Sequence, residues 1–211
     1  MSFQRARTRE QIRNRQKEIL DACRVLFEDN DYDSITLKAI SESTSICRSS
    51  MYSYYQSKED LFLDLLKDDY LDWGKTLKKG FDRRPPMTRE EFCRFLTDTL
   101  LEREEMSRLW SLHMTTLEKN CSLEKLTEFK KSIQPVMDTF DEGLKVIFPS
   151  SNEKSREEFQ AHFFIFSFSL YPYCHCSDKQ ARAMENAGVC GMNRDIKDLC
   201  YSGVYLLTLN L

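Results

Sequence analysis

The sequence predicts an all-α protein of about nine or ten helices. The 211 residues include only 6 Gly and 5 Pro, which is too few turn formers for a many-stranded sheet and suits long helices joined by short loops. Apolar residues also recur at helical spacing, as at Ile12, Ile19, Cys23 and Phe27. Hydrophobic residues make up 41% and charged residues 31%, a balance typical of globular chains that fold in water.

Capping residues predict where the N-terminal helices begin. Thr8 is followed three positions later by Gln11, a capping box that opens the helix "REQIRNRQKEILDACRVLFEDN". Thr36 is a favourable N-cap for a second helix, "LKAISES". After a break at residues 43–45, the segment "ICRSSMYSYY" is expected to form a third, short helix.

A longer helix over residues 57–80 is expected to connect two domains, 1–56 and 57–211. Ser57, with Asp60 three residues further on, is placed to cap the start of this helix. The segment "RRPP" follows the helix and is the clearest helix breaker in the chain. The second domain is therefore the larger of the two.

The second domain shows the same start and stop signals. Thr88 is followed by Glu91 at the spacing of a capping box. Ser122 opens another helix, in which Pro135 should produce a kink. Gly188 ends the segment "SDKQARAMENAG", where glycine is the usual residue after a helix. We therefore expect helices throughout this domain.

The charge is unevenly distributed along the chain. The formal net charge of -3 gives no overall positive field that would indicate a nucleic-acid partner. Residues 1–17 nevertheless form a basic arm, in which Glu10 is the single acid. The cations of this arm are Arg5, Arg7, Arg9, Arg13, Arg15 and Lys17.

The composition also predicts a cytoplasmic protein that does not span a membrane. The N-terminus is charged and polar and has no apolar segment typical of a secretory signal. The aromatic-rich stretch 161–171 is shorter than the roughly 20 residues that a membrane-spanning helix needs. The 8 cysteines are then most simply cytosolic thiols.

Residues 9–55 have the organisation of a helix-turn-helix unit, in which the second helix of the pair lies in the DNA major groove. The helix that begins near Cys47 is two-sided. Its packed side is expected to hold Cys47, Met51, Tyr54 and Tyr55, and its polar side Arg48, Ser49, Tyr52 and Ser53. Hydroxyl and guanidinium groups are good donors to phosphate oxygens. Lys58, in the first turn of the next helix, would form a phosphate clamp with the free N–H groups of that helix.

The stretch "ILDACRVLFEDNDYDSITLKAISESTSICRSSMYSYYQSKEDLFLDLL" resembles the DNA-binding region of the tetracycline-repressor-like (TetR) family. The shared pattern is an apolar helix ending in "LF", a Thr that opens helix two, and Tyr-x-Tyr-Phe-x-x-Lys-x-x-Leu, which reads "YSYYQSKEDL" here. The sequence departs from the pattern in three places. Ser45 replaces the usual Gly of the turn, Ser41 an Ala, and Tyr55 a Phe. If the turn requires positive φ, Ser45 carries a mild conformational cost.

The resemblance implies a homodimeric transcription regulator, most simply a ligand-responsive repressor that binds a palindromic DNA operator and senses an unknown small molecule. It also implies roles for individual residues. Thr36 and Lys38 would contact the DNA backbone, Arg48, Ser49 and Ser50 would approach base edges, and Tyr52, Tyr54 and Lys58 would bind phosphates.

Residues 159–173 are so rich in aromatic side chains that a helix there would be apolar on nearly every side. The core covers one side of such a helix, and a partner subunit can cover another. We therefore expect this helix and the last helix to form an isologous four-helix dimer interface. The residues expected at this interface are Phe166, Ile196, Leu199, Gly203, Leu206 and Leu207.

Five residues of the second domain are candidates for the lining of an effector cavity, which the resemblance implies. These are Trp110, His113, Met114, Phe140 and Phe164. Aromatic and Met side chains at helical spacing are also common in an ordinary core, so the sequence leaves both interpretations open.

An alternative switch is the segment Cys174–His175–Cys176, whose thiols and imidazole could bind a soft metal or respond to oxidants. Adjacent residues of an extended segment point in different directions, and Cys190 or Cys200 could join only through folding. We therefore expect no metal site. The remaining histidines stand in no metal-binding or catalytic motif, so neither a cofactor nor an enzymatic activity is expected.

Overall fold

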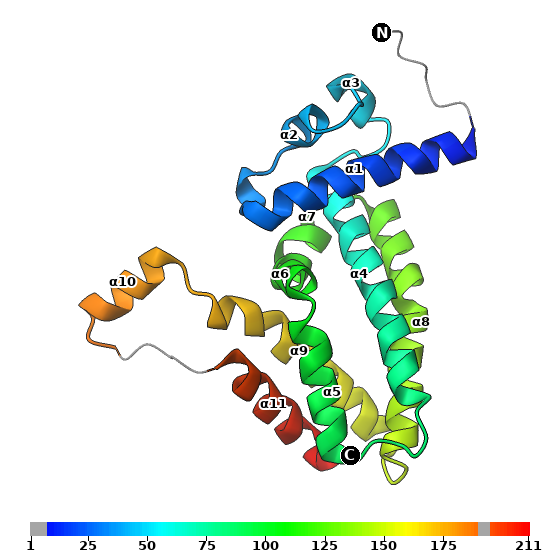
Figure 1. Cartoon of the computed structure of the whole chain (residues 1–211), viewed down its shortest axis with the longest axis vertical. Helices are drawn as coiled ribbons and strands as arrows, with labels where there is room; N and C mark the ends of the chain where they lie inside the picture. The colour runs from blue at the N-terminus through cyan, green and yellow to red at the C-terminus, as the bar shows by residue number, and fades with distance from the viewer. Residues whose placement is uncertain (1–7, 190–194) are drawn as a thin grey trace. The chain divides into compact units, whose positions relative to one another are not determined.

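The computed structural model describes residues 8–189 and 195–211, and within these residues every regular element is helical (Figure 1). The all-α prediction is therefore confirmed. The chain divides into two compact units. The first comprises Met1–Lys67 and Thr115–Lys131, and the second comprises Asp68–Met114 and Ser132–Leu211.

This division differs from the expected boundary at residue 56. The first unit continues to Lys67 because the first turns of the connecting helix are buried in it, with Leu61, Phe62 and Leu65 inaccessible to solvent. It also includes residues 115–131, which were expected to lie in the second domain.

The first unit begins with three helices and a short 3-10 turn. These elements are α1 (Arg9–Asp29), η1 (Tyr32–Ser34), α2 (Leu37–Glu42) and α3 (Arg48–Met51). The predicted capping box of α1 is present, since the Thr8 side chain accepts from the Gln11 N–H and the Gln11 side chain from the Thr8 N–H. The predicted cap of α2 is also present, with the Thr36 hydroxyl accepting from the N–H of Ala39.

The two long helices α4 (Lys58–Phe81) and α8 (Leu123–Ile147) each have residues in both units and run side by side (Figure 1). The Ser57 hydroxyl accepts from the Asp60 N–H at 3.0 Å, as expected for the cap of α4. The helix α8 continues through Pro135. Because proline has no N–H, the carbonyl four residues earlier, that of Lys131, loses its helical hydrogen bond.

The remaining helices belong mainly to the second unit. They are α5 (Arg89–Leu101), α6 (Glu104–Leu112), the π-helical turn η2 (His113–Leu117), α7 (Glu118–Asn120), α9 (Glu153–Cys174), α10 (Asp178–Asn186), α11 (Ile196–Leu207) and η3 (Thr208–Asn210). The predicted capping box between Thr88 and Glu91 opens α5. Gly188 follows α10 with a φ of 64°, the left-handed conformation that glycine adopts most readily.

Aromatic rings form the centre of the second unit. The ring of Trp73 lies 5.6 Å from Trp110 and 5.7 Å from Phe140, between centroids, and stacks on Phe163 at 6.3 Å. A close approach at Gly143 helps to build this core, because a Cβ there would overlap the ring of Phe81. No helix among the described residues is long and apolar enough to cross a lipid bilayer.

Candidate nucleic-acid interface

The helix α3 has one buried and one exposed side. Met51 and Tyr55, on the packed side, are almost completely buried. Arg48 and Ser49 are exposed, and Tyr52 keeps 52% of its surface accessible. The structure therefore confirms that the segment presents a short, polar and cationic surface to solvent.

The turn before α3 is attached to α1 through Ser45. Its backbone N–H donates to Glu18 Oε1 at 2.6 Å, and its hydroxyl accepts from Arg15, which also pairs with Glu18 at 3.0 Å. Among the described residues, no non-glycine residue has positive φ. Ser45 therefore does not carry the conformational cost that a serine would have at a turn position requiring positive φ. Burial acts to raise the pKa of Glu18, but the hydrogen bonds from Ser45 and Arg15 outweigh it and lower that pKa.

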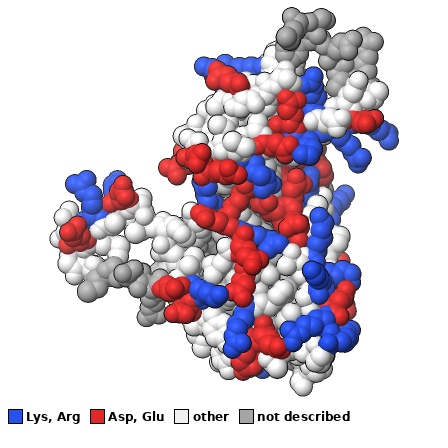
Figure 2. All heavy atoms as spheres, viewed as in Figure 1, with Lys and Arg blue, Asp and Glu red and all other residues white. Residues whose placement is uncertain are grey.

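Two cations of the basic arm are engaged in contacts within the chain and are not free to bind DNA. Arg15 serves the turn, and Lys17 pairs with Asp21 at 2.8 Å. Arg9 and Arg13 are exposed on α1. The remaining cations of the arm, Arg5 and Arg7, lie outside the described residues. In Figure 2, basic and acidic side chains are interspersed over the face that is shown, in keeping with the small net charge.

The other predicted DNA contacts of this unit are placed near its surface. Thr36 and Lys38 are exposed on α2, and Lys38 lies 3.7 Å from the carboxylate of Glu42. Ser50 is half-buried and its hydroxyl contacts Cys47 Sγ at 3.1 Å. Tyr54 is also half-buried.

Lys58 differs from the other candidates because it is engaged inside the protein. Its ammonium group donates to the backbone carbonyl of Tyr32 at 2.8 Å and lies 3.7 Å from the centroid of that ring. The Tyr32 hydroxyl in turn donates to Glu59 at 2.6 Å. Burial lowers the pKa of Lys58. The lysine therefore holds η1 against the start of α4, and its role as a phosphate ligand stays a prediction.

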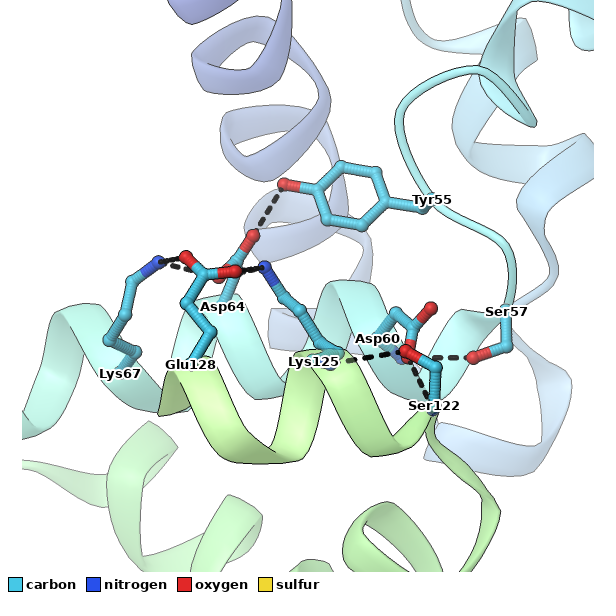
Figure 3. Close-up of polar contacts among 8 residues, drawn as sticks. All are labelled: Tyr55, Ser57, Asp60, Asp64, Lys67, Ser122, Lys125 and Glu128. Carbon is cyan, nitrogen blue, oxygen red and sulfur yellow. Dashed lines mark hydrogen bonds and ion pairs between the residues drawn. The ribbon is translucent and has the colours of Figure 1, made fainter. Parts of the chain in front are cut away.

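A buried polar cluster joins Tyr55 to α4 and α8, and it was not predicted from the sequence (Figure 3). The Tyr55 hydroxyl donates to Asp64 Oδ2 at 3.0 Å, while Asp64 Oδ1 pairs with Lys67 at 2.5 Å and with Lys125 at 2.7 Å. Burial acts to raise the pKa of Asp64, but hydrogen bonds from Lys125 and Lys67 lower it below its ordinary value. The one signal in the sequence was Tyr55 itself, because a hydroxyl at a buried position requires a partner.

Four of the five predicted cavity residues come together in the interior of the second unit. Trp110 lies 5.8 Å from Phe164, Phe164 lies 6.2 Å from Phe140, and His113 is buried beside Phe168 at 5.3 Å. Met114 is not part of this group, since it is 62% exposed. The buried line along this segment runs through Met106, Leu109, Trp110, His113 and Leu117. Met114 lies to the side of that line.

The predicted interface residues lie on α9 and α11, which pack against each other. Phe166 packs within the chain, against Gly203, where a Cβ would overlap the ring. Ile196, Leu199 and Leu207 are half-buried, whereas Leu206 is 65% exposed.

The segment Cys174–His175–Cys176 shows no arrangement for metal binding. His175 stacks on Tyr171 with 4.1 Å between ring centroids, and its Nδ1 lies 3.0 Å from the Tyr171 carbonyl oxygen. Within residues 8–189 and 195–211, no group of three or more His, Cys, Asp or Glu side chains is placed to hold a metal ion. Cys190 lies outside these ranges.

A helix-turn-helix unit followed by a larger helical unit defines a class of DNA-binding proteins. Residues 19–65 match the family profile described as bacterial regulatory proteins, tetR family, and residues 67–208 match that of the tetracyclin repressor-like C-terminal domain. The chain belongs to the TetR family of transcriptional regulators.

Similar sequences among curated proteins match only part of the chain. The chain is 33% identical over 64 residues to the uncharacterised helix-turn-helix regulator YxbF of Bacillus subtilis, covering 30% of this chain and 17% of that protein. It is 29% identical over 67 residues to the transcriptional repressor AcnR of Corynebacterium efficiens, covering 32% of this chain and 36% of that protein. The chain thus matches well under half of the length of these relatives.

Solved structures are similar over nearly the whole chain. The regulator FadR of Bacillus subtilis, in complex with stearoyl-CoA, superposes with a TM-score of 0.60 at 14% identity, covering 92% of this chain and 98% of that chain. The TetR-family repressor FadR of Thermus thermophilus, in complex with lauroyl-CoA, gives a TM-score of 0.61 at 14% identity, covering 93% and 94%. At such identities the similarity establishes the fold.

Proposed function

We propose that this protein is a homodimeric, ligand-responsive transcription regulator that acts as a repressor at a palindromic operator. The observation that carries the proposal is the two-sided α3, whose exposed side is short, polar and cationic while its other side is buried. Family membership supports a regulator rather than an enzyme. Its proposed partner is double-stranded DNA, which places the protein in the cytoplasm.

The exposed side of α3 has the chemistry needed in a major groove. Arg48 and Ser49 can donate to base edges, where an arginine recognises guanine through two hydrogen bonds. Tyr52, Tyr54 and the residues at the start of α2 can donate to phosphates and so position the helix. Lys58 would reach a phosphate only after leaving Tyr32, at the cost of its internal hydrogen bond.

Exposed apolar side chains support a dimer through α9 and α11. Ile165 and Leu206 are each 65% exposed, and Tyr173 and Leu209 are also accessible. A second copy related by two-fold symmetry would cover these side chains. Two-fold symmetry also suits an operator whose half-sites lie about 34–36 Å apart, one turn of DNA.

The interior of the second unit supports an effector with a large apolar part. Its aromatic rings provide an apolar environment, and within the described residues the buried Trp110 Nε1 and Ser167 Oγ have no hydrogen-bond partner. The two FadR proteins of the same fold were solved with stearoyl-CoA and lauroyl-CoA, so long-chain acyl-CoA thioesters are the first compounds to test. Binding would favour a dimer whose two α3 helices no longer match successive major grooves.

The function can be tested by selecting duplexes from a random-sequence DNA library with the full-length protein and measuring their affinities at several salt concentrations. We expect Tyr52→Phe to weaken binding to all sequences, whereas Arg48→Ala should cost about 1–3 kcal/mol and relax the preference at one base position. Arg182→Ala, which removes an exposed arginine of α10 in the second unit, serves as the control and should leave the affinity unchanged.

Two results would contradict the proposal. One is the absence of saturable, salt-sensitive binding of the unmodified protein to any duplex. The other is an Arg48→Ala variant that keeps both the base preference and the affinity of the unmodified protein.

A further inference from the structure

The chain passes between the two compact units three times: after Lys67, after Met114 and after Lys131. Residues Thr115–Lys131, which we call the coupling hairpin, therefore belong to the unit that carries α3. The matched C-terminal family domain, 67–208, nevertheless contains this hairpin. A segment of the effector-binding part of the sequence is thus packed as part of the DNA-binding unit.

The tip of the coupling hairpin is bonded to the first turn of α4. The Ser122 N–H and hydroxyl donate to Asp60 Oδ1 at 2.9 Å and 3.3 Å, and Asp60 is almost completely buried (Figure 3). The same Ser122 hydroxyl accepts from the N–H of Lys125, so the start of α8 and the start of α4 share one hydrogen-bonded group.

A second link lies one turn further along both helices. Lys125 of the hairpin pairs with the buried Asp64, which accepts the hydroxyl hydrogen bond of Tyr55 (Figure 3). Tyr55 follows the last residue of α3 by four positions, and its N–H donates to the Met51 carbonyl at 3.1 Å. An unbroken series of polar contacts thus runs from the end of α3, through Asp64, to α8.

Both legs of the hairpin are irregular where they cross into the second unit. The crossing after Met114 lies within the π-helical turn η2. The crossing after Lys131 lies in α8, where the Lys131 carbonyl has no helical hydrogen bond because Pro135 has no N–H. Helices bend or change register most easily at such points. Beyond the two crossings, His113 and Phe140 are buried among the aromatic rings of the second unit.

We propose that the coupling hairpin carries the regulatory signal between the effector core and α3 through the contacts Lys125–Asp64–Tyr55, while Ser122–Asp60 anchors the hairpin to α4. This inference rests on the proposed function and names its route of regulation. A buried carboxylate that loses its partners is strongly disfavoured, so the cluster favours discrete arrangements over gradual deformation. A movement of either leg would therefore disturb the Lys125–Asp64 ion pair and, through it, the hydrogen bond between Asp64 and Tyr55 at the end of α3.

Coupling is reciprocal, so DNA bound at α3 must also affect the hairpin. The test is hydrogen-exchange mass spectrometry of the full-length protein with and without a duplex that the unmodified protein selects from a random-sequence library. We expect DNA to slow amide exchange in two regions, residues 36–54 and residues 118–131. The second region contains none of the proposed DNA contacts.

Two variants test the route. Tyr55→Phe removes only the hydroxyl and leaves Asp64 paired with both lysines, whereas Lys125→Met removes the hairpin's charge. In each variant the slowing at 36–54 should persist and that at 118–131 should be lost. Lys131→Met, an exposed lysine on the same helix, should keep both effects. Thermal melts identify a variant that fails to fold. Tyr55→Phe should destabilise the fold less than Lys125→Met, because it removes a hydroxyl and leaves the ion pairs of Asp64 in place.

Two outcomes would overturn the inference: unchanged exchange at 118–131 in the unmodified protein when DNA slows 36–54, or slowing at 118–131 that survives in Tyr55→Phe. A failure of the proposed function would look different. In that case no duplex is selected and 36–54 is not slowed, and the inference fails together with the function on which it rests.

Discussion

The hydroxyl of Tyr55 occupies a position where the family pattern has Phe. A buried hydroxyl without a partner costs roughly 1–3 kcal/mol, so the substitution is tolerated only if an acceptor is present. Asp64 provides that acceptor, and its own charge is compensated by Lys67 and Lys125. The Tyr55 hydroxyl thus contacts a buried ionic group made of Asp64, Lys67 and Lys125.

Cys47 is the residue whose chemistry should respond to the environment of α3. Hydrogen bonds with Ser49 and then Ser50 lower its pKa to about 7, whereas burial raises the pKa of Cys93 and raises that of Cys200 to about 11. Because the thiolate is the reactive form, iodoacetamide at neutral pH should label Cys47 well before Cys93 and Cys200.

Peptide mass spectrometry over a time course measures this order of labelling. Addition of a selected DNA duplex should slow the labelling of Cys47 alone among these three, since the other two are buried in the second unit. Equal rates for the three thiols in the folded protein would contradict the assigned environments.

At the scale of the elements, the helix starts were the most predictable feature. Thr8, Thr36, Ser57 and Thr88 each cap a helix as expected, because a cap depends on residues within three positions. The turn before α3 was not predictable in this way. Its attachment joins Ser45 to Glu18, 27 residues apart, and only the packing of α1 brings these two together.

The attachment of the turn should make stability depend on pH. The pKa of Glu18 is lowered in the folded protein, so its contribution is fully present above the ordinary value of 4.5 and is lost as the pH falls through the lower folded value. We expect Glu18→Gln to lower the free energy of unfolding at pH 7 by about 1 kcal/mol, a small value because solvent screens this half-exposed carboxylate.

Urea unfolding at several pH values from 7 down to about 3 measures this effect. The difference between the unmodified protein and Glu18→Gln should stay constant above pH 4.5 and shrink below it, as Glu18 takes up a proton. The exposed Glu10 provides the control, and Glu10→Gln should show no such trend. A difference that does not shrink below pH 4.5 would contradict the role assigned to Glu18.

At the scale of the whole molecule, the proposed dimer makes a specific prediction. Leu206 is 65% exposed on α11 and contributes little to the fold of a single chain. Leu206→Glu should therefore convert the dimer to monomers while leaving the helical content unchanged, because a charge would be buried at the interface without a partner.

Sedimentation velocity over a range of protein concentrations measures the oligomeric state. Val25, on α1, is similarly exposed at 62%, so Val25→Glu should leave the dimer intact. A Leu206→Glu protein that remains a dimer, or an unmodified protein that is monomeric at all concentrations, would contradict the proposed interface.

The all-α class, the helix starts, the helix-turn-helix unit and its two-sided third helix follow from the sequence alone. They could be predicted because each depends on residues a few positions apart, through caps, helical spacing and the preferred conformations of Pro and Gly. The aromatic character of the second unit was equally visible.

Only the tertiary structure decided that residues 115–131 join the DNA-binding unit, that Lys58 turns inward onto Tyr32, and that Asp64 meets Lys125. These features join residues that are more than 20 positions apart. No local preference encodes such pairs, since they form where a buried charge finds its counter-charge on another helix as the chain packs.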